Sequence, residues 1–124
     1  MTSKKVVNFI SGHIDLTQEE FDRYYCALLD RAIDRDECFV VGDAKGTDTL
    51  AQQYLFGRTE AVIVYHMFAS PRNNVGFPTR GGFQSDVERD TQLTLDSERD
   101  IAWVRRGRER SGTQANLDRR SKKE

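Results

Sequence analysis

The 124-residue sequence has few residues that could tie a small domain together covalently or through a metal. It contains two cysteines, Cys26 and Cys38, and two histidines, His13 and His66, all well apart along the chain. A disulfide-rich secreted domain carries more cysteines than this, and a metal site needs clustered ligands. Cys26 lies in a helical pattern and Cys38 begins an apolar strand pattern. We therefore expect two reduced, packed thiols of a cytoplasmic protein, and no metal.

Long apolar runs and an excess of one charge are also missing. No apolar run approaches the ~20 residues that a membrane-spanning helix requires. The apolar run after the basic N-terminal residues is short and interrupted by Asn8, unlike a secretory signal. The formal net charge is −1, so composition gives no argument for binding nucleic acid. The length fits one domain, which we expect to span residues 1–120, with a frayed tail at 121–124.

Apolar runs and helical patterns alternate along the chain. Strands are predicted at residues 6–10, 38–41, 61–66 and 100–104. Helices are predicted at 17–33, 47–57, 85–97 and 113–120. Thr17 with Glu20, and Ser85 with Glu88, have the spacing of capping boxes at two helix starts. This alternation predicts an α/β fold, with a mostly parallel sheet of at least four strands and helices on both faces.

Residues 68–84 interrupt the alternation. They contain both prolines and three glycines, with arginines and asparagines interleaved among three phenylalanines. A structureless loop of this length in a small domain is usually functional or disordered, and the aromatic residues argue against disorder. We expect either a flap over the ligand-binding edge of the sheet or a loop that packs against a partner subunit. The sequence favours neither.

Three loops rich in glycine or small residues each follow a predicted strand and precede a predicted helix, at residues 11–17, 42–47 and 107–113. The carboxyl ends of parallel strands meet at one edge of a sheet, where ligands bind. The first N–H groups of a helix and its dipole both favour an anion. The three loops together predict a phosphate or nucleotide site, although each motif taken alone also fits a plain strand–helix turn.

Backbone N–H groups and hydroxyls supply most of the candidate phosphate or ribose contacts: Ser11, Gly12, Gly42, Gly46, Thr47, Ser111, Gly112 and Thr113. Thr47 is also a candidate cap of the helix that follows it. Lys45 and Arg108 are candidate phosphate cations or exposed loop cations, and His13 is a candidate base contact or a surface residue. We expect valine at Gly46 or at Gly112 to abolish ligand binding while the fold is retained.

No pair of nucleophile and base can be assembled from the sequence. A glycosidic-bond enzyme needs a well-placed carboxylate, for which Asp43, Glu88 and Asp90 are candidates. Asp43 would alternatively accept hydrogen bonds from ribose hydroxyls, as acidic residues do in dinucleotide sites. Asp48 is either a second such acceptor or, as the sequence favours, a charge at a helix N-terminus. Arg89 faces either the ligand edge or solvent.

At these residues the chain resembles the SLOG superfamily, which includes the LOG phosphoribohydrolases, the DNA-processing protein DprA and YspA/YpsA-like proteins. The segment Gly42–Ala51 is similar to its GxAxGxDxxA loop, Ser111–Leu117 to its GTxxN motif, and Glu88-Arg89-Asp90 to its R(D/N) helix. The resemblance implies one Rossmann-like three-layer αβα domain that binds a nucleotide-derived ligand on the loop edge and often forms a homodimer. It adds Arg89 and Asn116 to the candidate contacts, and Arg89, which matches an arginine of the LOG enzymes, joins Asp43 and Glu88 as a candidate catalytic residue. We expect no cofactor.

One difference from the LOG enzymes decides the functional expectation. Their PGGxGTxxE signature carries a catalytic glutamate, whereas Asn116 follows Gly112-Thr113 here without a preceding Pro-Gly pair. We therefore expect a sensor, carrier or sequestering protein for a nucleotide or an NAD-derived or ADP-ribose-like molecule. The alternatives are an N-glycosidic-bond enzyme (a nucleoside 5'-monophosphate hydrolase or deoxyribosyltransferase) and a DNA-processing accessory protein. The near-neutral charge counts against the last.

Overall fold

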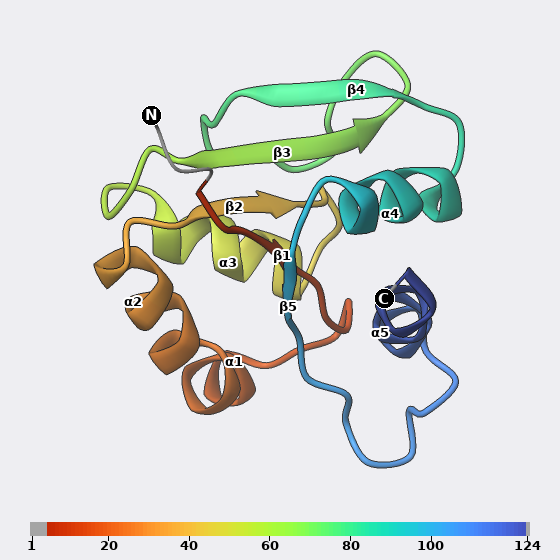
Figure 1. Cartoon of the computed structure of the whole chain (residues 1–124), viewed down its shortest axis with the longest axis horizontal. Coiled ribbons are helices and arrows are strands. Elements are labelled where there is room, and N and C mark those ends of the chain that lie inside the picture. The colour runs from red at the N-terminus through yellow and green to blue at the C-terminus, as the bar shows by residue number, and fades with distance from the viewer. Residues whose placement is uncertain (1–4, 124) are drawn as a thin grey trace.

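The computed structural model describes residues 5–123, and it contains a five-stranded sheet in the order β4-β3-β2-β1-β5 with every pairing parallel (Figure 1). The strands are β1 (Val7–Ile10), β2 (Cys38–Val41), β3 (Val62–Met67), β4 (Thr79–Phe83) and β5 (Arg99–Ile101). The helices are α1 (Gln18–Tyr24), α2 (Cys26–Asp34), α3 (Thr47–Leu55), α4 (Asp86–Leu95) and α5 (Gly112–Lys123). The predicted α/β fold with a Rossmann-like parallel sheet is confirmed.

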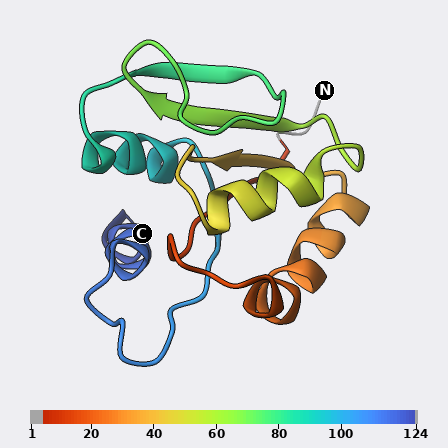
Figure 2. The same ribbon diagram turned by 180° about the vertical axis from the view of Figure 1, so that it is seen from behind.

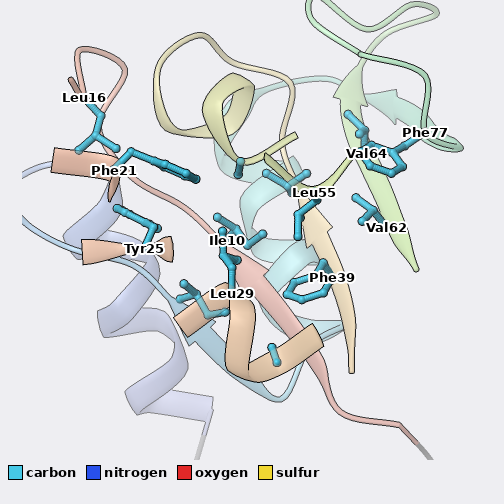
Figure 3. Packing of buried hydrophobic residues seen from close by; sticks show 14 residues of the cluster. Ile10, Leu16, Phe21, Tyr25, Leu29, Phe39, Leu55, Val62, Val64 and Phe77 are labelled. Carbon is cyan, nitrogen blue, oxygen red and sulfur yellow. The ribbon is translucent and has the colours of Figure 1, made fainter. Parts of the chain in front are cut away.

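Alternation along the strands divides the core between the two faces of the sheet. Ile10, Val41 and Val64 belong to a cluster that α1, α2 and α3 cover (Figure 3). Phe9 and Tyr65 belong to a second cluster, which includes a buried leucine of α4. Figures 1 and 2 show α1 to α3 on one side of the sheet and α4 and α5 on the other. Each fully buried apolar side chain contributes roughly 1.5–3 kcal/mol to folding, so both helix layers are held by the sheet.

The segment 68–84 is not a structureless loop throughout. Its last part is β4, which pairs with β3 at the edge of the sheet. The strand was missed because only Phe83 of its five residues is buried, so it has no alternating apolar pattern. A Cβ at Gly81 would lie 2.2 Å from the His66 ring, which explains why a glycine occupies a strand here. The loop itself is limited to residues 68–78.

The helix predicted at 17–33 is divided at Tyr25 into α1 and α2. Its capping box is present, since the Thr17 hydroxyl accepts from the Glu20 N–H at 3.1 Å and the Glu20 carboxylate accepts from the Thr17 N–H at 3.0 Å. Tyr25 is buried, and its hydroxyl donates to the Ser11 carbonyl at 2.8 Å and accepts from the Trp103 N–H at 3.0 Å. The break in the helix therefore positions the Tyr25 hydroxyl, which links the segment after β1 to the segment after β5.

The last helix is longer than expected. Although we expected residues 121–124 to fray, α5 continues through Lys123, and Glu124 lies outside the described residues. None of the helices in the described part of the chain has the length and apolar character to cross a membrane.

Candidate functional site

A cavity of about 540 Å³ lies at the carboxyl edge of the sheet. The cavity lies beside the end of β1, which has β2 on one side in the sheet and β5 on the other. The strand order reverses at this point, and ligands of open α/β sheets bind at such a reversal. The volume lies in the range of small-molecule sites. The candidate residues that line it are Ser11, Gly12, His13, Gly42, Lys45, Arg89, Arg108, Ser111, Gly112, Thr113 and Asn116. The structure therefore brings residues of the three loops, α4 and α5 together around one cavity.

Gly46 and Thr47 are candidates that do not line the cavity. Gly46 is the N-cap of α3 at φ +76°, and a Cβ there would lie 2.4 Å from the Ile14 carbonyl oxygen. Thr47 is fully buried, and both its N–H (3.1 Å) and its hydroxyl (2.9 Å) donate to the His13 carbonyl. The expectation that Thr47 caps α3 is wrong, because its hydroxyl joins α3 to the loop after β1 instead.

Glu88, a candidate catalytic carboxylate, also lies outside the cavity lining. Its carboxylate accepts from the Gln84 N–H at 3.0 Å, and its own N–H donates to the Ser85 hydroxyl at 3.1 Å. The side chain is exposed at the start of α4. Glu88 thus caps this helix and is not placed to act on a ligand in the cavity.

Asp43, the second carboxylate candidate, is fully buried behind the cavity lining. One of its oxygens accepts from the Arg72 N–H at 2.7 Å, and the other accepts from Arg72 Nη2 and Arg89 Nη1, both at 2.9 Å. Burial disfavours the charge, but these hydrogen bonds and the two guanidinium groups outweigh it and lower the pKa of Asp43. Asp43 is therefore an ionised anchor that positions Arg72 and Arg89.

Arg89 faces the ligand edge, and its side chain is only 6% exposed. Besides Asp43 it contacts Asp86 (3.2 Å) and Asp90 (3.1 Å), so three carboxylates surround one guanidinium. A Cβ at Gly42 would lie 3.2 Å from Arg89 Cζ, so the glycine permits this close approach. Arg89 thus has its charge compensated within the protein, and it is less available to a phosphate than a free cation would be.

Asp48 is more deeply involved in the cavity than the favoured sequence interpretation, a charge at a helix start, indicated. It lines the cavity, is 8% exposed and accepts from the Ala44 N–H at 3.1 Å. Burial raises the pKa of Asp48 to about 7, although Arg89 and the Ala44 N–H oppose the shift. A carboxyl that titrates near neutral pH is typical of acid–base and ligand-binding sites. The available signal was its place in the GxAxGxDxxA pattern, for which we favoured a helix charge over a contact with ribose hydroxyls.

The raised pKa predicts how stability depends on pH. Between the ordinary pKa of an aspartate and about 7, the folded chain holds a proton on Asp48 that the unfolded chain releases. Asp48 therefore makes the protein less stable as the pH rises through this interval, by up to about 1.4 kcal/mol per pH unit. Asp48→Asn should remove this contribution. Urea unfolding of the wild type and of Asp48→Asn from pH 4 to pH 8 measures this contribution. If the free energies of unfolding of the two proteins depended on pH in the same way, the raised pKa of Asp48 would be contradicted.

The side of the cavity that favours an anion is the start of α5. Among the described residues, the N–H groups of Gly112 and Thr113 have no hydrogen-bond partner, and both residues line the cavity. Arg108 lines the same cavity and is 42% exposed. At α3, by contrast, the Thr47 N–H is already bonded to the His13 carbonyl. At α5 the helix dipole and two unpaired donors therefore lie together beside the cavity.

The Ser11 hydroxyl gives independent evidence of a missing polar partner. Ser11 is 6% exposed, and its Oγ is buried without a hydrogen bond in the described part of the chain. Buried hydroxyls in native proteins are nearly always paired, so an unpaired one needs an explanation. Because Ser11 lines the cavity, a ligand with a polar group at this point would provide the partner.

His13 is less free to contact a base than expected. Its Nε2 accepts from the Arg105 N–H at 2.8 Å, and its ring lies edge-on to Trp103. Burial lowers the pKa of His13, and Arg108 and Arg105 lower it further. The ring is therefore held neutral, with only Nδ1–H left to donate. Within residues 5–123, no group of three or more His, Cys, Asp or Glu side chains is arranged to hold a metal ion.

These contacts define a cavity that is lined both by N–H donors and by buried carboxyl groups. Comparisons of the chain with protein-family models, with curated proteins and with solved structures each find no match. The chemistry of the cavity is therefore what indicates its ligand.

Proposed function

We propose that this protein binds a nucleotide or a nucleotide-derived molecule, such as an ADP-ribose-like one, and acts as a sensor, carrier or sequestering protein. The observation that carries the proposal is the unpaired Ser11 hydroxyl, which lies in the same cavity as the start of α5. A phosphate at α5 would accept from the Gly112 and Thr113 N–H groups. The fold and the loop motifs agree with membership of the SLOG superfamily, which we include in the proposal.

The carboxyl groups that line the cavity fit the sugar of such a ligand. Asp48 and Asp90 line it, and burial raises the pKa of both carboxyl groups, against the opposing effect of Arg89. A carboxylate accepts from two ribose hydroxyls, and a protonated carboxyl can also donate. The cavity therefore offers N–H donors for a phosphate and carboxyl groups for the polyhydroxylated part of one molecule.

Isothermal titration calorimetry with AMP, ADP-ribose and NAD tests the proposal. We expect at least one of them to bind with a dissociation constant in the micromolar range. Arg108→Gln should weaken that binding about tenfold, as the loss of one charge-assisted hydrogen bond does. Arg106→Gln is the matched control, because Arg106 is exposed and outside the cavity lining. Binding no better than millimolar for every nucleotide tested would contradict the proposal.

An N-glycosidic-bond enzyme is the second candidate, and the environment of Asp48 is what favours it. Cleavage of such a bond needs a proton for the departing base, and an acid that titrates near neutral pH provides one efficiently. The two carboxylates first considered, Asp43 and Glu88, are used as an ion-pair anchor and a helix cap. The catalytic candidate is therefore Asp48, with Asp90 beside it.

Incubation with nucleoside 5'-monophosphates separates the two candidates. We expect the wild type to release no free base, because Asn116 stands where LOG enzymes carry their glutamate and an amide is neither a base nor a nucleophile. Chromatography of the reaction mixture measures the free base. Multiple-turnover release that is lost in Asp48→Asn and retained in Glu88→Gln would overturn the binding proposal and establish the enzyme.

A further inference from the structure

A second pocket, of about 350 Å³, lies between α2 and the edge strand β5, and it shares no lining residue with the first cavity. Its charged side chains include three arginines: Arg31 and Arg35 from α2, and Arg99 from β5. Its base includes the buried side chain of Asn8 from β1. None of these residues takes part in the nucleotide site described above.

The register of the sheet explains why these residues meet. Asn8 pairs with Arg99 across β1 and β5, and Ile10 pairs with Ile101 two residues further on. Ile10 and Ile101 belong to the core under α1 to α3, so Asn8 and Arg99 face the same helices. Arg31 lies in the last turn of α2 and Arg35 is the C-cap four residues later, so the two side chains are neighbours at the end of this helix.

The pocket has more positive charge than its surroundings compensate. Within residues 5–123, Arg31 and Arg35 form no ion pair, although like charges at this spacing on a helix repel. Arg99 donates to Glu37 at 2.9 Å and is 47% exposed, which leaves most of its donors free. Asp100, which also lines the pocket, is paired with Arg120 of α5. The N–H donors left without an ion-pair partner therefore belong to guanidinium groups, whose geometry suits binding of an oxyanion.

Asn8 provides the second, independent observation. Its Nδ2 donates to the Glu37 carboxylate at 3.0 Å and to the Cys38 carbonyl at 3.2 Å, which fixes the orientation of the amide. Its Oδ1 is buried and has no hydrogen-bond partner among the described residues. Because Nδ2 is turned toward β2, Oδ1 lies on the opposite side of the amide, toward β5. Asn8 lines the arginine-lined pocket, so a buried and unpaired acceptor lies at its base, and a donor of an occupant would provide its partner.

We propose that this pocket is a second ligand site, specific for a phosphate group that also offers a hydrogen-bond donor. Arg31, Arg35 and Arg99 bind the phosphate oxygens, and Asn8 Oδ1 accepts from a protonated phosphate oxygen or from a hydroxyl of a sugar phosphate. Sulfate has the same shape and charge but no proton at neutral pH, so it places an oxygen against Oδ1. The site should therefore prefer phosphate to sulfate.

Two-dimensional ¹H–¹⁵N NMR titrations at constant ionic strength test this inference, with sodium phosphate, ribose 5-phosphate and sodium sulfate as separate ligands. We expect saturable shifts of the backbone amides at residues 31–35 and 99–101 with both phosphates, and sulfate binding at least about tenfold weaker. Tighter binding of ribose 5-phosphate than of inorganic phosphate would identify the donor as a sugar hydroxyl, and the reverse would identify it as the protonated oxygen. The amides of Gly112 and Thr113 report the first cavity separately.

Arg31→Gln and Arg35→Gln should each weaken phosphate binding at residues 31–35 about tenfold, whereas Arg106→Gln should leave it unchanged. These arginines are exposed, so the variants keep the core intact. Phosphate shifts confined to the first cavity would overturn the proposal. Equal affinity for phosphate and sulfate would also overturn it, because the pocket would then be a general positive surface without the acceptor's selectivity.

Discussion

Gly46→Val is expected to destabilise the fold by about 3–5 kcal/mol, an effect that combines backbone strain with overpacking. Gly46 has φ +76°, which a β-branched residue rarely adopts. Its Cβ would also lie 2.4 Å from the Ile14 carbonyl oxygen and 2.6 Å from that of His13. Both are backbone atoms, so no side-chain rotation relieves the contact. Urea unfolding followed by circular dichroism measures the loss.

This result would correct the expectation that valine at Gly46 removes binding and leaves the fold intact. Gly112→Val is the matched control, because a Cβ at Gly112 has no neighbour within 4 Å. We expect it to change stability by less than about 1 kcal/mol and to abolish nucleotide binding at the start of α5. If Gly46→Val were as stable as the wild type, the loop after β1 would not contact the start of α3 in the way described.

Asp43→Ala is expected to cost about 3 kcal/mol, the lower end of the range for removing one partner of a buried ion pair. Its side chain is 1% exposed and that of Arg89 is 6% exposed, so solvent cannot replace the lost carboxylate. Arg89 keeps Asp86 and Asp90, which limits the loss. Arg72 is 46% exposed, so its pair with Asp43 adds little to stability. Urea unfolding at neutral pH tests the value.

Asp86→Ala is the control for this prediction. Asp86 contacts the same two arginines, but it is 60% exposed, and such pairs contribute at most about 1 kcal/mol. We expect Asp43→Ala also to weaken nucleotide binding, because Arg89 and the loop at Arg72 lose the group that positions them beside the cavity. Equal losses of stability in the two variants would show that burial of Asp43 does not make its ion pair stronger.

Local patterns in the sequence determined the main elements of the fold and the edge where the cavity lies. The β-branched and apolar runs predicted β1, β2 and β3, and Thr17 and Ser85 marked the starts of α1 and α4. These signals are local because strand alternation, helix periodicity and caps depend on neighbours within a few residues. Parallel alternation then placed the loops at one edge, so most candidate cavity residues were found without a structure.

The tertiary structure alone decided the features that depend on residues far apart in the chain. The division of the helix at Tyr25 follows from hydrogen bonds to Ser11 and Trp103, and β4 exists because β3 offers a free edge. The neutral-range pKa of Asp48 comes from its burial, which outweighs the opposing charge of Arg89. The unpaired Oδ1 of Asn8 is seen only once β5 lies next to β1. A short motif identifies the side chains, but burial and distant partners set their charge and their availability to a ligand.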